Sequence, residues 1–184
     1  VNVKLEAAQR LYQVDAARGD AELEATRALV REAMGGLRRS LADMRGPLPG
    51  ADDLAGALRQ LAAEAQARSQ LTVRVVDELR ATRPPPATAT ALLLIAREAL
   101  MNVERHAGAR SAELRVGCAE GAWLLAVCDD GRGLRPEELR RPGHYGVVGM
   151  RERAAALGGA LRVAPRPGGG TEVVATIPEQ GAPR

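Results

Sequence analysis

The spacing of apolar residues changes at residues 46–50, and this change most restricts how the chain can fold. Before it, apolar residues recur every seven positions, as in a helix that packs on other helices, at Leu23, Val30, Leu37 and Met44. After it, alternating runs and helical patterns follow one another. We therefore expect a helical segment over residues 1–45, a linker over 46–53, a mixed domain over 54–178 and a tail over 179–184.

The first segment is predicted to form a helical hairpin. A helical pattern over residues 1–15 ends near Gly19, and Asp20 is suited to cap a second helix over residues 21–45. The apolar faces of two such helices exceed what one hairpin can bury, so we expect a homodimer in which residues 1–45 pair into a four-helix bundle. The alternative is a hairpin that packs on its own globular domain.

The composition fits one compact domain with an accessory segment. Of 184 residues, 46% are hydrophobic and 27% are charged, which excludes a disordered chain, and no apolar window reaches the length of a membrane span. We expect a cytoplasmic segment whose parent protein meets a membrane only through parts outside this chain. The net charge of +3 mixes both signs and gives only weak support for nucleic acid, so no direct nucleic-acid partner is expected. Cys118 and Cys128 are expected to be reduced core residues.

Residues 54–178 carry the pattern of an α/β sandwich, in which helices cover one face of a mixed sheet, so the whole chain is predicted to be α+β. Asp52 and Asp53 precede the first helical pattern and can cap it. Helices are predicted over residues 54–65, 88–106 and 147–157. Strands are predicted over residues 71–76, 112–118, 123–128, 160–164 and 171–177.

Three clusters of polar residues and glycines stand out within this domain. Glu98, Asn102, Arg105 and His106 share one face of the second predicted helix, and their oxygens and cations suit hydrated Mg²⁺ with phosphates beyond it. The alternative for this cluster is a solvated helix face. An acid-glycine loop, residues 129–133, follows directly on a strand, and glycines of residues 143–149 lead into a helix whose N-terminus suits phosphate oxygens. Ordinary turns are the alternative for these two.

Together, the order and spacing of the three clusters resemble the Bergerat-fold (GHKL) ATP-binding domain, and more closely the catalytic domain of two-component sensor histidine kinases of the NarX/DesK-like subfamily. The N box of that family, Glu-Ala-Leu-x-Asn-x-x-Arg-His-Ala, is matched by residues 98–107, and its G1 box, Asp-x-Gly-x-Gly, by residues 129–133. The subfamily's Gly-Met-Arg-Glu-Arg-Ala stands at residues 149–154, and a closing Gly-Thr-x-Val with Ile-Pro falls within residues 170–178. The predicted hairpin resembles the latter part of the subfamily's dimerisation and phosphoacceptor domain.

The resemblance implies ATP and Mg²⁺ as ligands and gives roles to the matched residues. Glu98 would orient or deprotonate water and the attacking imidazole and would meet Mg²⁺ through water, while Asn102 would hold Mg²⁺ directly. Arg105 and His106 would contact phosphates, and Asp129 would bind the adenine amino group. The other ATP-binding residues implied are Gly131, Gly133, Gly146, Val147, Gly149, Met150 and Thr171.

The chain departs from the family pattern in its histidines. The family's phosphoacceptor is a His on the first hairpin helix, whereas this chain has only His106, in the N box, and His144. His144 lies in the lid, residues 134–145, where many kinases have the first glycine of the G2 box, the motif that runs into residues 149–154. We expect that the first helix has lost its N-terminal part together with the acceptor. The default for the lid is a solvated loop, and the alternative is a loop whose arginines are drawn to the triphosphate, namely Arg135, Arg140 and Arg141.

The resemblance therefore predicts the catalytic core of a protein-histidine kinase that binds Mg-ATP but cannot label itself. In the intact protein the γ-phosphate would pass to a His and then to an Asp of a response-regulator receiver domain. One alternative is an anti-sigma-factor Ser/Thr kinase of the same fold, which does not explain the seven-residue repeat. The other is a non-catalytic dimerisation module with a degenerate nucleotide pocket, against which the intact Glu98, Asn102 and Asp129 argue.

Overall fold

The computed structural model describes residues 15, 18–20, 23, 26, 53–80, 82–133 and 145–179. The chain divides into two compact units, Val1–Gly46 and Pro47–Arg184, and each is treated by itself. Most of the predicted hairpin lies outside the described residues, as does the predicted lid with Arg135, Arg140, Arg141 and His144. Among the residues that are described, no helix has the length and apolar character that crossing a membrane requires.

In the first unit, the described residues correct the predicted start of a helix. Residues 18–20 are helical, so the prediction that Asp20 caps a helix from residue 21 is wrong. Asp15 takes that place, because its Oδ1 accepts a hydrogen bond from the Arg18 N–H at 3.2 Å. Its carbonyl oxygen also accepts the Gly19 N–H at 3.0 Å. A carboxylate at this position satisfies a backbone donor that the first helical turn leaves without a partner.

The second unit is built on a mixed five-stranded sheet with the order β1-β2-β3-β5-β4. Only β1 and β2 run parallel, and the other three neighbouring pairs are antiparallel. The strands are β1 Thr72–Glu78, β2 Ser111–Ala119, β3 Ala122–Asp129, β4 Ala160–Pro165 and β5 Thr171–Pro178. The predicted mixed sheet is confirmed. Each strand ends one or two residues later than predicted, because backbone pairing continues past the apolar alternation, and β1 begins one residue later.

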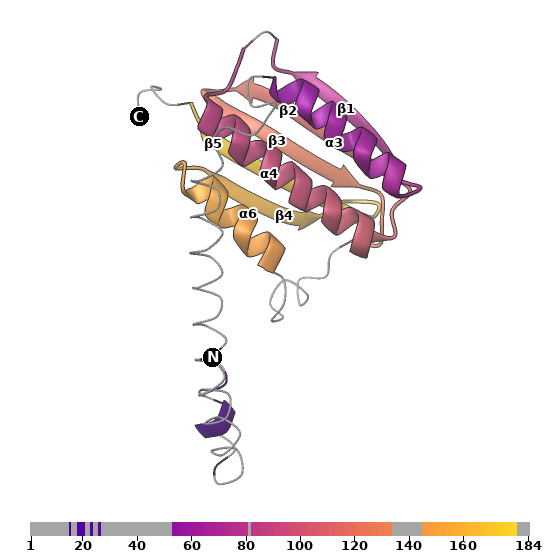
Figure 1. Ribbon diagram of the computed structural model, residues 1–184, viewed down its shortest axis with the longest axis vertical. Helices are drawn as coiled ribbons and strands as arrows, with labels where there is room; N and C mark the ends of the chain where they lie inside the picture. The colour runs from indigo at the N-terminus through magenta and orange to yellow at the C-terminus, as the bar shows by residue number, and fades with distance from the viewer. Residues whose placement is uncertain are drawn as a thin grey trace. The chain divides into compact units, whose positions relative to one another are not determined.

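Three helices cover one face of this sheet: α3 Leu54–Arg68, α4 Pro86–Asn102 and α6 Tyr145–Ala155. Figure 1 shows α4 in the middle of this layer, between α3 and α6. The predicted cap of α3 is confirmed at Asp53, whose Oδ1 accepts the Gly56 N–H at 2.9 Å. The side of α3 that faces the core consists of Leu54, Ala55, Leu58, Leu61, Ala62 and Ala65.

The central helix α4 is buried more completely than its sequence pattern predicts. Leu92, Ile95, Ala96 and Leu100 are at most 1% exposed, because the helix contacts the sheet behind it and a helix on each side. Two other apolar residues of this helix, Leu94 and Met101, are only half-buried. A helix buried on several sides carries apolar residues nearly all round, so its pattern does not identify one buried face.

The end of this helix also differs from the prediction. The α-helix ends at Asn102, four residues before the predicted end at His106, and the chain continues as one π-helical segment, Val103–Ala107. Gly108 then ends the segment in the left-handed conformation, with φ of 60°. A π-helical turn is wider than an α-helical turn, so Arg105 and His106 do not follow the α-helical spacing of Glu98 and Asn102.

Alternation along β3 separates the two faces of the sheet. Trp123, Leu125, Val127 and Asp129 are buried on the side of the helices, while the residues between them are half-buried on the open side. The open side carries ion pairs between strands, including Arg115 of β2 with Glu78 of β1 at 3.6 Å. Cys118 and Cys128 are free thiols of intermediate exposure rather than core residues, and partial burial raises the pKa of each.

Candidate functional site

The end of β3 places a buried carboxylate at the start of a glycine loop. Asp129 is the last residue of the strand and is only 3% exposed. Its Oδ1 accepts the Gly131 N–H at 2.8 Å. Within the described part of the chain, no hydrogen bond to its Oδ2 is found, so this oxygen is open to a donor from a ligand. Burial of an acid with one unused oxygen is the arrangement of a site that reads a hydrogen-bond donor.

The loop after Asp129 lies directly against the end of the N box. A methyl group at Gly131 would overlap the carbonyl oxygen of Ala107 and would come within 2.8 Å of the Ala107 Cβ. The chain can take this path only because Gly131 has no side chain. The N-box and G1-box residues predicted from the sequence therefore meet in space.

The turn between β4 and β5 closes the other side of this loop. Arg166 Nη1 donates a hydrogen bond to the Asp129 carbonyl oxygen at 2.9 Å. A Cβ at Gly133 would lie 3.2 Å from the carbonyl oxygen of Gly170, so these two glycines are also neighbours. Thr171, which opens β5, is half-buried beside them. The backbone of Asp129 is thus held by residues far away in the sequence.

Glu98 lies on α4 against the start of α6. A Cβ at Gly146 would overlap the Glu98 Oε1, and it would lie 3.1 Å from the carboxyl carbon. Glu98 and Asn102 are both half-buried and one turn apart on α4. The structure thereby places the N-box acid next to the first glycine of α6, and Gly149 follows one turn later with intermediate exposure.

Two residues expected to bind nucleotide have a packing role in this structure. Met150 is fully buried and Val147 is 9% exposed, both within the hydrophobic core. Together with the fully buried Ala154 they form the side of α6 that packs against the rest of the domain. Their burial fixes the position of α6, and hence of Gly146, rather than presenting a side chain to a ligand.

The predicted Mg²⁺ ligands have the right donor chemistry. Glu98 offers a carboxylate and Asn102 an amide oxygen, which are hard donors of the kind that Mg²⁺ prefers. In the described ranges, no group of three or more His, Cys, Asp and Glu residues can hold a metal ion.

Arg105 and His106 lie exposed in the π-helical segment. The backbone of His106 is tied down, because its carbonyl oxygen accepts a hydrogen bond from Arg132 Nε at 2.9 Å. Glu104, between Asn102 and these residues, pairs with Arg68 of α3 at 3.1 Å and anchors the segment on the other side. Both side chains therefore start from a fixed backbone.

Three residues of this site were not singled out in the sequence. Ala107 is the last residue of the N box, but the motif does not indicate that its carbonyl oxygen meets the G1 loop. Arg166 contributes its guanidinium from a Pro/Gly turn and has no local sequence signal. Asp130 does have one, since it is a second acid within the G1 box. Hydrogen bonds from the Ser111 backbone, the Ser111 hydroxyl and the Arg110 backbone lower the pKa of its carboxyl.

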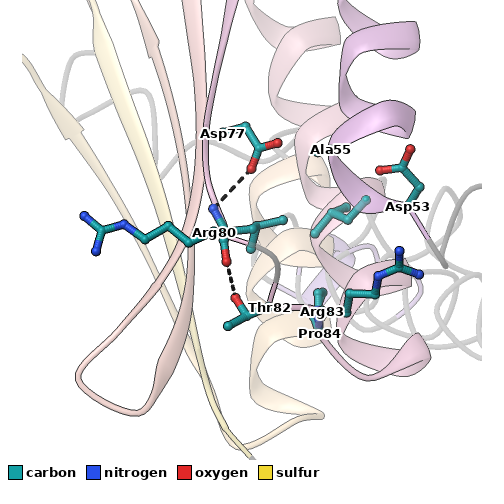
Figure 2. A pocket seen from close by; sticks show the side chains of 9 residues that line it. Asp53, Ala55, Asp77, Arg80, Thr82, Arg83 and Pro84 are labelled. Carbon is teal, nitrogen blue, oxygen red and sulfur yellow. Dashed lines mark hydrogen bonds between the residues drawn. The ribbon is translucent and has the colours of Figure 1, made fainter.

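A separate pocket of about 400 Å³ lies at the other end of the sheet, and Figure 2 shows its residues. It is lined by Asp53 at the start of α3, by Asp77 at the end of β1, and by the loop with Thr82 and Arg83. Asp77 accepts the Leu79 N–H at 3.1 Å and pairs with Arg59 at 2.9 Å. None of the three sequence clusters contributes to this pocket, so it is not the site that they predict.

Comparison with known proteins finds relatives of the kind that the three motifs resemble. Residues 87–181 match the family described as histidine kinase-, DNA gyrase B- and HSP90-like ATPases. The nitrate/nitrite sensor protein NarX of Escherichia coli strain K12 is 37% identical over 172 residues, covering 88% of this chain and 28% of NarX. The sensor histidine kinase NarS of Mycobacterium tuberculosis is 31% identical over 180 residues, covering 95% of this chain and 41% of NarS.

A solved structure is also similar. The blue-light activated histidine kinase EL346 of Erythrobacter litoralis superposes with a TM-score of 0.60 at 28% identity, over 70% of this chain and 42% of that one. This chain thus spans less than half the length of each of these relatives. The similarities agree with the resemblance drawn from the N-box, G1 and G2 motifs.

Proposed function

The chain belongs to the histidine kinase-, DNA gyrase B- and HSP90-like ATPase family, and from this membership we propose that it is the ATP-binding catalytic core of a NarX-like sensor histidine kinase. The observation that carries the proposal is the convergence of the three motifs on one place. Gly131 of the G1 box lies on Ala107 of the N box, and Glu98 of the N box lies on Gly146. These two contacts bring together motifs that lie apart in the sequence, at residues 98–107, 129–133 and 146–149.

In the proposed complex, Asp129 identifies the base. Its Oδ1 is held by Gly131, and its Oδ2 accepts a hydrogen bond from the adenine amino group. A buried acceptor whose only polar partner is the ligand discriminates strongly, because a base without the donor would leave the carboxylate unsatisfied. Gly131 and Gly133 shape the base pocket, and Thr171 lines it from β5.

The triphosphate is proposed to lie between α4 and α6. Asn102 holds Mg²⁺ and Glu98 meets it through water, while Arg105 and His106 reach phosphate oxygens. The backbone N–H groups of the first turn of α6, that of Gly146 among them, face the same anion, and Gly149 follows on the same helix. Mg²⁺ supplies charge neutralisation for the phosphates when it is bound.

The proposed reaction is phosphoryl transfer to a histidine of the longer protein. A nitrogen of the acceptor imidazole forms a bond to the γ-phosphorus while the bond from that phosphorus to the bridging oxygen breaks. ADP leaves with the electron pair, and Glu98 receives the proton that the imidazole releases. Positioning and charge neutralisation supply most of the catalysis in such transfers. The phosphoryl group then passes to an Asp of a response-regulator receiver domain, and residues 1–45 provide the homodimer contact.

The test is a thermal shift with Mg-ADP. At a nucleotide concentration 100 times Kd, binding stabilises the folded state by about 2.7 kcal/mol, which is roughly 5–11 °C in Tm for a chain of this size. We expect Asp129→Asn to abolish the shift, because the amide presents a donor where the base also presents one. Asp77→Asn is the matched control, an acid at another strand end, and should keep the full shift. An unchanged Tm for the wild type at millimolar Mg-ADP would refute the nucleotide site.

A further inference from the structure

Two residues of the G1 box make hydrogen bonds to the segment between the N box and β2. They stand at the two positions that the family motif leaves variable. The motif specifies Asp129, Gly131 and Gly133, and it places no requirement on the residues between them. In this chain those residues are Asp130 and Arg132. Both make hydrogen bonds to residues 106–111, which run from the end of the π-helical segment to the first residue of β2.

Asp130 makes a compact set of contacts with the start of β2. Its Oδ1 accepts the N–H groups of Arg110 at 2.8 Å and of Ser111 at 2.9 Å. Its Oδ2 accepts the Ser111 hydroxyl at 2.8 Å. Its own N–H donates to the Ser111 carbonyl oxygen at 3.2 Å. One exposed carboxylate therefore satisfies three donors from two consecutive residues.

Arg132 makes hydrogen bonds to the other end of the same segment. Its backbone N–H donates to the Ala107 carbonyl oxygen, and its Nε donates to the His106 carbonyl oxygen, both at 2.9 Å. Between Asp130 and Arg132, Gly131 lies on Ala107 without room for a side chain. The G1 loop thus contacts this segment at both of its ends.

The Asp130 carboxylate adds contacts beyond the backbone bonds that pair the strands. The β2–β3 register runs from Ala119↔Ala122 to Ala112↔Asp129, and the Asp130 N–H adds one further backbone bond, to the Ser111 carbonyl oxygen. The carboxylate of Asp130 lies just beyond the last pair of this ladder. Its hydrogen bonds fix the position of residues 106–111 relative to Asp129. They thereby fix the phosphate-binding end of the site relative to the base-binding end.

We propose that Asp130 is a positioning residue of the nucleotide site, which fixes the N-box exit segment, residues 106–111, at the correct distance from Asp129. The inference rests on the proposed ATP-binding function. We call the hydrogen bonds from Asp130 to Arg110 and Ser111 the clamp. Without the clamp, the distance between the N-box exit segment and the buried Asp129 is no longer fixed, and a nucleotide must order the two on binding. Ordering at the moment of binding lowers affinity.

The experiment compares variants of the full chain by two measurements, the Kd for Mg-ADP from calorimetry and amide hydrogen exchange without nucleotide. Asp130→Ala should raise Kd by about tenfold, about 1.4 kcal/mol of binding free energy, and should speed exchange at residues 106–111. Asp130→Asn should stay within about twofold of the wild type. Its side-chain oxygen keeps both backbone N–H donors, and its amide can donate to the Ser111 hydroxyl.

Asp77→Ala is the control for general destabilisation. Asp77 also accepts a backbone N–H at a strand end and also pairs with a neighbour, but it lines the separate pocket of Figure 2. We expect a lower Tm for Asp77→Ala with Kd for Mg-ADP unchanged.

Three outcomes would overturn the proposal, and they differ in what they refute. If Asp130→Ala binds Mg-ADP like the wild type, the positioning role is wrong while the nucleotide site stands. An equal rise in Kd for Asp77→Ala would show that lost stability, rather than the clamp, lowers affinity. If the wild type binds no Mg-ADP, the proposed function fails, and the exchange measurement alone then decides whether Asp130 holds residues 106–111.

Discussion

Replacing Gly170 with alanine should damage the domain more than replacing its neighbour Gly168, although both glycines have φ of 87°. In Gly170→Ala, the new methyl group would overlap the carbonyl oxygen of Asp129 and lie within 2.7 Å of the carbonyl carbon. In Gly168→Ala, the same group meets no atom within 4 Å. Comparing the two variants separates two free-energy costs that usually occur together, that of backbone strain and that of steric overlap.

The backbone cost is common to both variants. An L-residue at positive φ costs roughly 1–2 kcal/mol relative to glycine, and Gly168→Ala should show this alone. Gly170→Ala adds overpacking against backbone atoms, which cannot rotate away as the end of a side chain can, and this costs roughly 1–3 kcal/mol more. For a chain of this length the difference corresponds to about 2–12 °C in Tm.

Thermal unfolding followed by circular dichroism measures both values, and calorimetry with Mg-ADP adds a second readout. Because the overlapped carbonyl belongs to Asp129, Gly170→Ala should also weaken nucleotide binding, whereas Gly168→Ala should not. Equal Tm values for the two variants would refute the reasoning, since they would show that the β4–β5 turn does not press on the Asp129 backbone.

Two further predictions concern acid and the core. The hydrogen bonds from Ser111 and Arg110 depress the pKa of Asp130 below its ordinary value of 3.8, so the carboxylate stabilises the fold fully above that value and loses its effect as pH falls below it. The Tm difference between the wild type and Asp130→Asn should therefore shrink in titrations below about pH 4; a constant difference would contradict this. Leu92→Ala, at a fully buried position of α4, should cost about 2–5 kcal/mol by urea unfolding, and Leu161→Ala, half-buried on the edge strand β4, should cost less.

Much of the fold could be predicted because each local signal agrees with the sheet that forms. Asp53 caps α3 as its position before an apolar stripe suggests. The alternation of β3 places Asp129 on the same face as Trp123 and Val127, which is why a carboxylate at the strand's end becomes buried. Period-two alternation and caps are local properties, so the sequence alone reports them.

The features that could not be predicted depend on contacts between distant segments. The helix after Asn102 shows no proline or glycine until Gly108, so its pattern gives no reason to stop at residue 102. It widens into a π-helical segment where Ala107 must meet the G1 loop and Glu104 must meet Arg68 of α3. The N-cap at Asp15 is not predicted for a different reason: a glycine favours the end of a helix, whereas Gly19 lies inside one.

The hydrogen bonds that hold residues 106–111 depend on side chains differently on their two sides. On the side of β2, two of the three donors to Asp130 are backbone N–H groups, which any residue except proline provides at positions 110 and 111. Only the Ser111 hydroxyl is specific to its side chain. On the side of the G1 box, every acceptor comes from the Asp130 carboxylate. Ser111→Ala should therefore change Mg-ADP affinity far less than Asp130→Ala, because it removes one bond of the three and leaves the segment held by the other two.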